Sequence, residues 1–261
     1  VPANPNEFPT TEYEGAPMLP FSIEFSSPRT VRIRAVSGFQ VKPDTDTLMI
    51  NHVLPVDHSW KYSKITGGHL YTGPNGSVTI LEHPWKIIFR DPAGKILTQT
   101  FNNSDNGSFT PVLPFSFVRR AKDYSRSMSA VFTLSPEEKI FGCGESFTEF
   151  NKRGQKVVLW TDDANGVQNE TMYKPIPFFM SNRGYGMFMH TSTPITCDFG
   201  KYFSGANSLM IGDDELDLFV FLGEPKDILD AYTDVTGKAA MPPLWSFGFW
   251  MSRITYFSET E

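Results

Sequence analysis

The chain has 261 residues, of which 40% are hydrophobic and 20% charged, a globular composition that excludes an intrinsically disordered protein. Its net charge of −6 and its lack of a basic cluster larger than Arg119, Arg120 and Lys122 argue against nucleic-acid binding. The longest apolar runs are about five residues, far short of the roughly 20 that a membrane-spanning helix requires. We therefore expect a globular protein that binds neither nucleic acid nor membrane.

Strands dominate the predicted secondary structure. In residues 30–36, apolar residues alternate with arginines in the sequence TVRIRAV, which predicts a strand with one buried face. Residues 85–101 predict a hairpin, because two strand-like runs flank a Pro-Ala-Gly turn. Residues 214–223 alternate again, and Phe219 and Phe221 indicate that both faces of this strand are covered.

One helix and one boundary are predicted near the end of the chain. The helix begins at Pro225 and ends at Gly237, because proline is favoured at a helix start and glycine at its end. A double proline then precedes an apolar run at 244–251, which predicts a buried strand. We therefore expect a β-sandwich domain over residues 1–240 and the first strand of another unit within 241–261.

The sequence predicts no metal site and no cofactor. The five histidines lack H-x-H or H-E-x-x-H spacing, so zinc is not expected. No Walker motif is present, and the segment GCGESF fails the dinucleotide pattern because Phe147 takes the place of its last glycine. Its glycines instead predict a tight turn from strand to loop. Cys143 and Cys197 are interpreted as two buried thiols, with a single disulfide as the alternative.

A pair of facing carboxylates, as glycoside hydrolysis requires, is also missing from the pattern. Asp162 and Asp163 are adjacent, and neighbouring side chains in an extended segment point to opposite sides. We therefore assign no catalytic residue to this chain. Four N-x-S/T sequons, which begin at Asn75, Asn102, Asn106 and Asn169, favour secretion over a cytoplasmic location without deciding the compartment.

Three motifs follow one another in the second half of the chain. They are EEKIFGCGESFTEFNKRGQ at 137–155, LWTDDANGVQNETMYKPIPFFMSNRGYGMFM at 159–189 and MPPLWSFGFWMSR at 241–253. Together they resemble glycoside hydrolase family 31, and its α-xylosidase-like branch more than the digestive α-glucosidases. Before residue 137 the resemblance extends only to the general strand pattern.

The resemblance implies a mainly β fold, in which an N-terminal, galactose-mutarotase-like β-sandwich is followed by the first strand of a (β/α)8 barrel that continues beyond this chain. It implies a retaining α-glycosidase that releases α-xylose or α-glucose from oligosaccharides. The family's two catalytic aspartates lie on later barrel strands, beyond Glu261. The remainder of the barrel, from the same precursor or from a second chain, is then an expected partner, and a homo-oligomer stays open.

The resemblance also places substrate-contacting residues. A W-x-x-D stretch in the family's sandwich reaches over the barrel mouth, and it matches Trp160 to Asp163, so Asp163 would accept hydrogen bonds from a sugar, with Asn165 close by. The alternative is that the Asp pair caps a turn. Arg253 would contact sugar or brace the barrel top. The residues expected to line the pocket after the first barrel strand are Ile254, Thr255 and Tyr256.

Two other kinds of function stay open at this point. A stand-alone carbohydrate-binding sandwich would account for the missing acids, but not for the apolar run at 244–251. A mutarotase-like enzyme would need a His and a Glu that converge on one concave face, and the spacing of the histidines gives no sign of such a pair.

Overall fold

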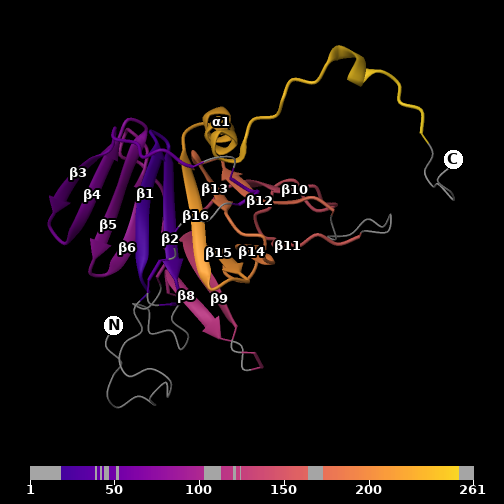
Figure 1. Cartoon of the computed structure of the whole chain (residues 1–261). Helices are drawn as coiled ribbons and strands as arrows, with labels where there is room; N and C mark the ends of the chain where they lie inside the picture. Colours follow the sequence, from indigo (N-terminus) through magenta and orange to yellow (C-terminus); the bar gives the residue numbers. More distant parts are fainter. Residues whose placement is uncertain are drawn as a thin grey trace.

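The computed structural model describes residues 19–38, 40–41, 43, 47–50, 53–102, 113–119, 122–123, 125–163 and 173–252. Within these residues the chain forms three antiparallel sheets, one α-helix and one short 3₁₀ helix (Figure 1). The fold is therefore mainly β, as predicted. One predicted feature is incomplete, because the sequence indicated a single sandwich and the structure has a third sheet beside it.

Sheet A contains six strands and sheet C contains five. The order in sheet A is β1 (Phe21–Ser27), β2 (Thr30–Val36), β16 (Glu215–Leu222), β13 (Tyr185–Met189), β12 (Pro175–Ser181) and β10 (Ile140–Gly144). The order in sheet C is β11 (Lys156–Leu159), β14 (Ile195–Phe199), β15 (Ala206–Ile211), β9 (Arg126–Thr133) and β8 (Phe115–Arg119). These two sheets share one hydrophobic core and form the sandwich.

Sheet B is a meander of five strands next to β1. Its order is β3 (Lys61–Ile65), β4 (Gly68–Gly73), β5 (Gly76–Glu82), β6 (Trp85–Arg90) and β7 (Ile96–Gln99). Strands β6 and β7 pair directly, which confirms the predicted hairpin. Val78, Ile87 and Phe89 of this sheet belong to the same core cluster as the sandwich, so sheet B is packed onto it.

Strand β16 is buried on both faces, as the sequence predicted. Its leucines and Val220 point into the core of the sandwich, while Phe219 and Phe221 contact the helix α1 (Pro225–Thr236) on the other side. The helix begins and ends where the sequence predicted, with Pro225 in its first turn and Gly237 at its C-cap. Its buried residues Ile228, Ala231 and Val235 cover the outer face of sheet A.

The prediction that one face of β2 is exposed to solvent is wrong. All seven residues of the strand are buried, including Arg32 and Arg34. Both arginines hydrogen-bond to carboxylates of the neighbouring strand β16, Arg32 to Asp217 at 2.8 and 2.7 Å and Arg34 to Glu215 at 2.8 and 2.6 Å. Since each charge is paired by two hydrogen bonds, the polar face of β2 can lie away from water.

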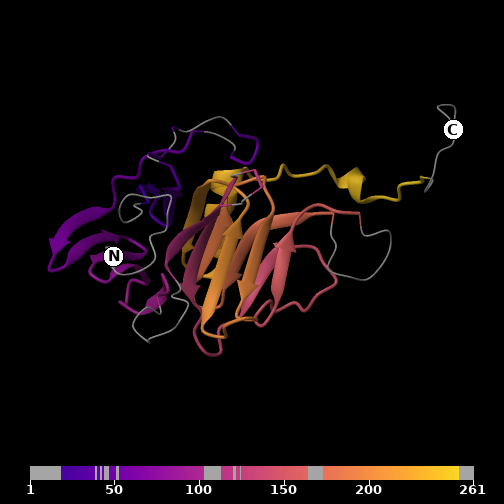
Figure 2. The same ribbon diagram turned by 90° about the horizontal axis from the view of Figure 1, so that it is seen from below.

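The predicted strand after the double proline is not formed within the described residues. Leu244–Phe247 form a 3₁₀ helix, with Ser246 N–H donating to Pro243 O and Gly248 N–H to Trp245 O, both at 3.0 Å. The segment runs away from the sandwich (Figures 1 and 2), so no described strand lies beside it to supply ladder hydrogen bonds. The domain boundary near residue 240 stays a prediction.

The glycines of the GCGES segment have a different role from the predicted turn. Gly142 lies inside β10 and Gly144 is its last residue, and the register with β12 shifts between them. Both have positive φ, 126° and 85°, and a Cβ on Gly144 would lie 2.1 Å from the Lys174 carbonyl oxygen. The glycines therefore allow a bulge and a close approach of two strands.

None of the described helices is long and apolar enough to span a membrane.

Candidate functional site

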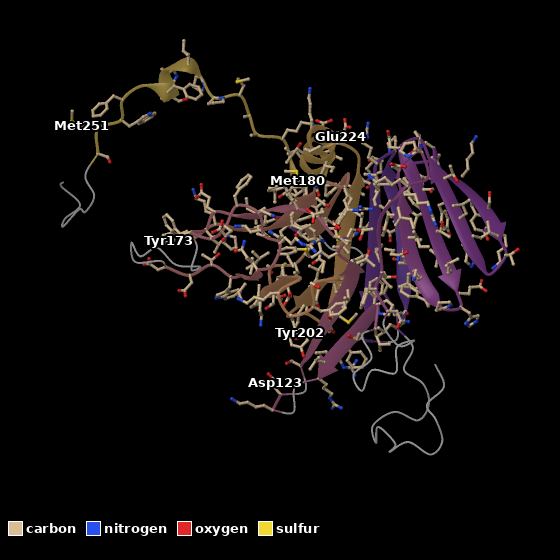
Figure 3. The ribbon with its side chains drawn as sticks, turned by 180° about the vertical axis from the view of Figure 1, so that it is seen from behind. Asp123, Tyr173, Met180, Tyr202, Glu224 and Met251 are labelled. Atoms are coloured by element: carbon tan, nitrogen blue, oxygen red, sulfur yellow. The ribbon has the colours of Figure 1, made fainter. Side chains whose placement is uncertain are left out.

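The loop that carries the W-x-x-D stretch joins β11 to β12. The structure describes this arm at its two ends, residues 160–163 and 173–174, and the arm extends beyond the body of the sandwich (Figure 1). Figure 3 places Tyr173 far out on it. Asn165 lies outside the described residues, as do the four candidates at the end of the chain, Arg253, Ile254, Thr255 and Tyr256.

The two adjacent aspartates make different contacts. Asp162 Oδ1 accepts a hydrogen bond of 2.9 Å from the backbone N–H of Asp163, its neighbour in the chain. The turn that the pair would cap lies outside the described residues, so that alternative stays open. The Asp163 carboxylate accepts instead a hydrogen bond from the Tyr173 hydroxyl, across the loop. The two ends of the loop are thus joined through Asp163, while its predicted contact with a sugar stays a prediction.

A cleft of about 400 Å³ lies at the base of this arm. Trp160, which is 53% exposed, lines it from one side, and the hydroxyl-bearing residues Thr161, Thr191, Ser192 and Thr193 supply polar groups. The remaining lining is apolar and comes from Met49, Leu159, Pro175, Pro177 and Ile195. An aromatic face beside several hydroxyls suits a ligand that has both C–H surface and hydrogen-bonding groups, as a sugar does.

A carboxylate within the first motif has a structural role. Glu138 is buried, and its two oxygens accept hydrogen bonds from Ser181 Oγ at 2.6 Å, Tyr185 Oη at 2.7 Å and Ser135 N–H at 2.8 Å. Burial, with the Glu138 charge beside it, raises the pKa of Tyr185 well above its ordinary value. Glu138 therefore fixes β10 to β12 and β13 and does not face the cleft.

Among the described residues, no cluster of three or more His, Cys, Asp or Glu could hold a metal.

One histidine–glutamate contact was missed by the sequence reasoning. His69 Nε2 lies 3.2 Å from Glu82 Oε1 on the exposed face of sheet B, and Lys64 Nζ lies 2.6 Å from the same oxygen. The hydrogen bond from Lys64 lowers the pKa of Glu82. A mutarotase-like site needs a His and a Glu that converge on one concave face. His69 and Glu82 do line a cleft of about 300 Å³, but there they contact each other and Lys64. This pair is therefore a surface network.

The two cysteines are buried and not joined by a disulfide, which confirms the first interpretation. The hydrogen-bonding contact with Cys143, together with burial, raises the pKa of the Cys197 thiol well above its ordinary value. A thiol held in this protonated state is a poor nucleophile, so Cys197 is not a catalytic candidate.

Comparison with known proteins identifies the domain that this geometry belongs to. Residues 20–198 match the family model of the glycosyl hydrolase 31 N-terminal galactose mutarotase-like domain. The chain belongs to this family. The matched range includes the arm, the cleft and most of the three sheets.

Curated members of glycoside hydrolase family 31 resemble the chain in sequence. It is 39% identical over 133 residues to an α-xylosidase of Emericella nidulans, which covers 50% of this chain and 17% of that protein. It is 38% identical over 135 residues to an α-xylosidase of Lactiplantibacillus pentosus, which covers 51% of this chain and 18% of that protein. The chain thus matches less than a fifth of the length of either relative.

Solved structures of family 31 members share the fold. A dextranase of Flavobacterium johnsoniae, complexed with isomaltotriose, matches with a TM-score of 0.73 at 23% identity, over 88% of this chain and 27% of the other. An α-xylosidase from a soil metagenome, complexed with xylose, matches with a TM-score of 0.68 at 21% identity, over 85% of this chain and 33% of the other. These likenesses support the sandwich and sheet arrangement described above.

Proposed function

We propose that this chain is the N-terminal part of a retaining α-glycosidase that releases terminal α-xylosyl or α-glucosyl residues from oligosaccharides. The observation that carries the proposal is the family match over residues 20–198, together with the identities of 39% and 38% to two α-xylosidases. The catalytic carboxylates would lie in a (β/α)8 barrel outside these 261 residues, either on the same precursor or on a second chain.

The contribution of this chain would be the arm between β11 and β12. Asp163 would accept hydrogen bonds from sugar hydroxyls at the mouth of the barrel, and Asn165 would lie beside it. Support comes from the arm's position beyond the sandwich and from the contact that holds the Asp163 carboxylate near Tyr173. The other pocket residues that we propose are Arg253, Ile254, Thr255 and Tyr256.

The segment at 244–251 would become the first strand of that barrel. In this structure its large side chains are exposed, with Trp245 at 70%, Phe247 at 73%, Phe249 at 91% and Trp250 at 65%. An apolar run of this kind on an exposed segment marks a surface that another part of a protein covers. The arm and this segment extend toward the same side of the sandwich (Figure 2), as a shared contact with one barrel would require.

A stand-alone carbohydrate-binding module is the second candidate. The cleft beside Trp160, which has hydroxyls but no pair of facing carboxylates, favours it. A measurement of glycoside hydrolysis separates the two functions. A binding module binds sugar without hydrolysing it, whether or not the protein is extended beyond these 261 residues.

The activity test compares this chain with a longer protein that includes the barrel. We expect the longer protein to hydrolyse a nitrophenyl α-xyloside or α-glucoside, and the 261-residue chain alone to hydrolyse neither, since both catalytic acids would be missing from it. Release of nitrophenol measures both. Turnover by the purified chain would contradict the placement of the catalytic acids, and an inactive longer protein that binds sugar would support the module.

A second prediction concerns the apolar segment. In the chain alone, backbone amides of residues 244–251 should exchange with deuterium much faster than those of the sheets, because none lies in a sheet and the large side chains are exposed. In the longer protein the same amides should be protected by neighbouring barrel strands. Hydrogen exchange with mass spectrometry measures both states. Equal protection in the two would show that the segment is not a barrel strand.

A further inference from the structure

A second concave surface lies on the outer face of sheet C. Strands β11, β14 and β15 pair so that two rows of side chains cross this face. The rows are Lys156, Asp198 and Ser208, and Val158, Thr196 and Met210. The intervening residues of the same strands, such as Val157, Cys197 and Leu209, are buried in the core, so the rows point toward solvent.

The end of this face forms a cleft of about 290 Å³. Its floor includes Ser208 and Met210, and the loop between β14 and β15 closes one side with Tyr202 and Phe203. Tyr202 is 96% exposed. Figure 3 shows it at the end of the sandwich away from Glu224 and distant from Tyr173 on the arm. The cleft is thus separate from the one beside Trp160, with which it shares no lining residue.

The loop that carries Tyr202 is held in place. Asp198 Oδ1 accepts hydrogen bonds from the backbone N–H groups of Lys201 at 2.8 Å and of Tyr202 at 3.2 Å. The ring of Phe203 packs against Phe101, with 5.5 Å between the ring centroids. An exposed aromatic ring on a fixed backbone is a preorganised contact surface, since little conformational freedom is lost when a ligand covers it.

The polar groups of the cleft are available to a ligand. Within the part of the chain that the structure describes, no hydrogen-bond partner is found for Lys156 Nζ, Thr196 Oγ1 or Ser208 Oγ. Lys156 and Asp198 face each other in the register, so the opposite charges of the surface balance. Such a site does not select for a charged ligand. The site presents the aromatic face of Tyr202, an apolar floor formed by Met210, and several hydrogen-bond donors and acceptors.

These features match a sugar ring more closely than the surface of another protein. A pyranose has C–H faces that cover an aromatic ring and hydroxyl groups that both donate and accept hydrogen bonds. A protein that covered the cleft would bury the two hydroxyls and the ammonium group, and each one left without a partner would be destabilising. Sugar hydroxyls can satisfy all three groups in a shallow site.

We propose that the cleft formed by Lys156, Ser208, Met210 and Tyr202 is a non-catalytic binding site for a neutral oligosaccharide chain. The choice of ligand class rests in part on the proposed function, whereas the location rests on the structure alone. A site of this kind, linked to a catalytic pocket on the same protein, raises the effective concentration of a long substrate at that pocket.

The test is a calorimetric titration of the 261-residue chain with three neutral probes, isomaltohexaose, maltohexaose and a xyloglucan heptasaccharide. We expect at least one to bind, and Tyr202→Ala to weaken that binding about tenfold, because the ring supplies the main apolar contact. Tyr62→Ala is the matched control, since Tyr62 is also an exposed tyrosine but lies on sheet B.

Three results would overturn the proposal. The chain could bind none of the three probes, or Tyr202→Ala and Tyr62→Ala could bind with the affinity of the unchanged protein. In the third result, analytical ultracentrifugation would show that Tyr202→Ala converts a dimer into a monomer. This face would then be a contact between protein chains. Thermal melting of both variants checks that they fold. Failure of the proposed function would appear elsewhere, as a longer protein that lacks turnover, and would leave these binding results unaffected.

Discussion

Replacing Asp217 with alanine should reduce the free energy of unfolding by about 3–5 kcal/mol, the range found when one partner of a buried ion pair is removed. Asp217 accepts hydrogen bonds from Arg32 at 2.8 and 2.7 Å and lies 2.7 Å from His190 Nδ1. The Arg32 side chain is only 6% exposed, so its charge would be left without its main partner in the interior. Urea unfolding followed by tryptophan fluorescence measures the loss.

The controls separate the lost charge pair from general damage. Asp230→Ala removes an exposed carboxylate that pairs with Lys238, and we expect little change in stability from it. A double variant, Arg32→Met with Asp217→Leu, should regain much of the loss, because two apolar side chains need no partner. If Asp217→Ala were as stable as the unchanged protein, the pair would not stabilise the sheet.

The same pair should make stability depend on pH in acid. Burial acts to raise the pKa of Asp217, but hydrogen bonds from Arg32 and His190 outweigh it and hold the pKa below the ordinary value of 3.8. A carboxyl with a lowered pKa in the folded state contributes stability above its unfolded pKa and loses it as the pH falls through the folded pKa. The stability advantage over Asp217→Asn should therefore be full near neutral pH and shrink below about pH 4.

The buried arginines show what periodicity can and cannot predict. The alternation in residues 30–36 correctly assigned a strand and sorted its side chains into two faces. It could not show that the polar face is covered, because the carboxylate that pairs with Arg32 comes from 185 residues later in the chain. A pattern in one strand carries information about its faces, but none about the strand that lies beside it.

The prediction of the arm was limited in the same way. The motif around Trp160 identified a loop between two strands and singled out Asp163. The hydrogen bond from Tyr173 joins residues ten positions apart across that loop, and no spacing rule predicts it. For 244–251 the apolar run predicted a buried strand, whereas its large side chains are exposed, because a strand forms only when a neighbouring strand supplies hydrogen bonds.

Replacing Asp163 with alanine in a longer, active protein should lower kcat/KM roughly ten- to hundredfold, or about 1.5–3 kcal/mol, the value of a hydrogen bond to a charged acceptor. Asp162→Ala should have a much smaller effect, because the Asp162 carboxylate accepts its hydrogen bond from the backbone of the loop. Melting temperatures should change little in either variant, since both side chains are exposed. Steady-state kinetics on an aryl α-glycoside measures the first effect.

The contact with Tyr173 allows a sharper form of this experiment. Tyr173→Phe removes the hydroxyl that donates to Asp163 but keeps the carboxylate and the ring. If Asp163 binds the sugar directly, Tyr173→Phe should retain most of the activity, and Asp163→Asn should recover part of what Asp163→Ala loses, because an amide oxygen still accepts a hydrogen bond. If Tyr173→Phe instead lost as much as Asp163→Ala, the carboxylate would serve to hold the two ends of the arm together. Unchanged kinetics for Asp163→Ala would remove Asp163 from the substrate site and leave it as part of the turn.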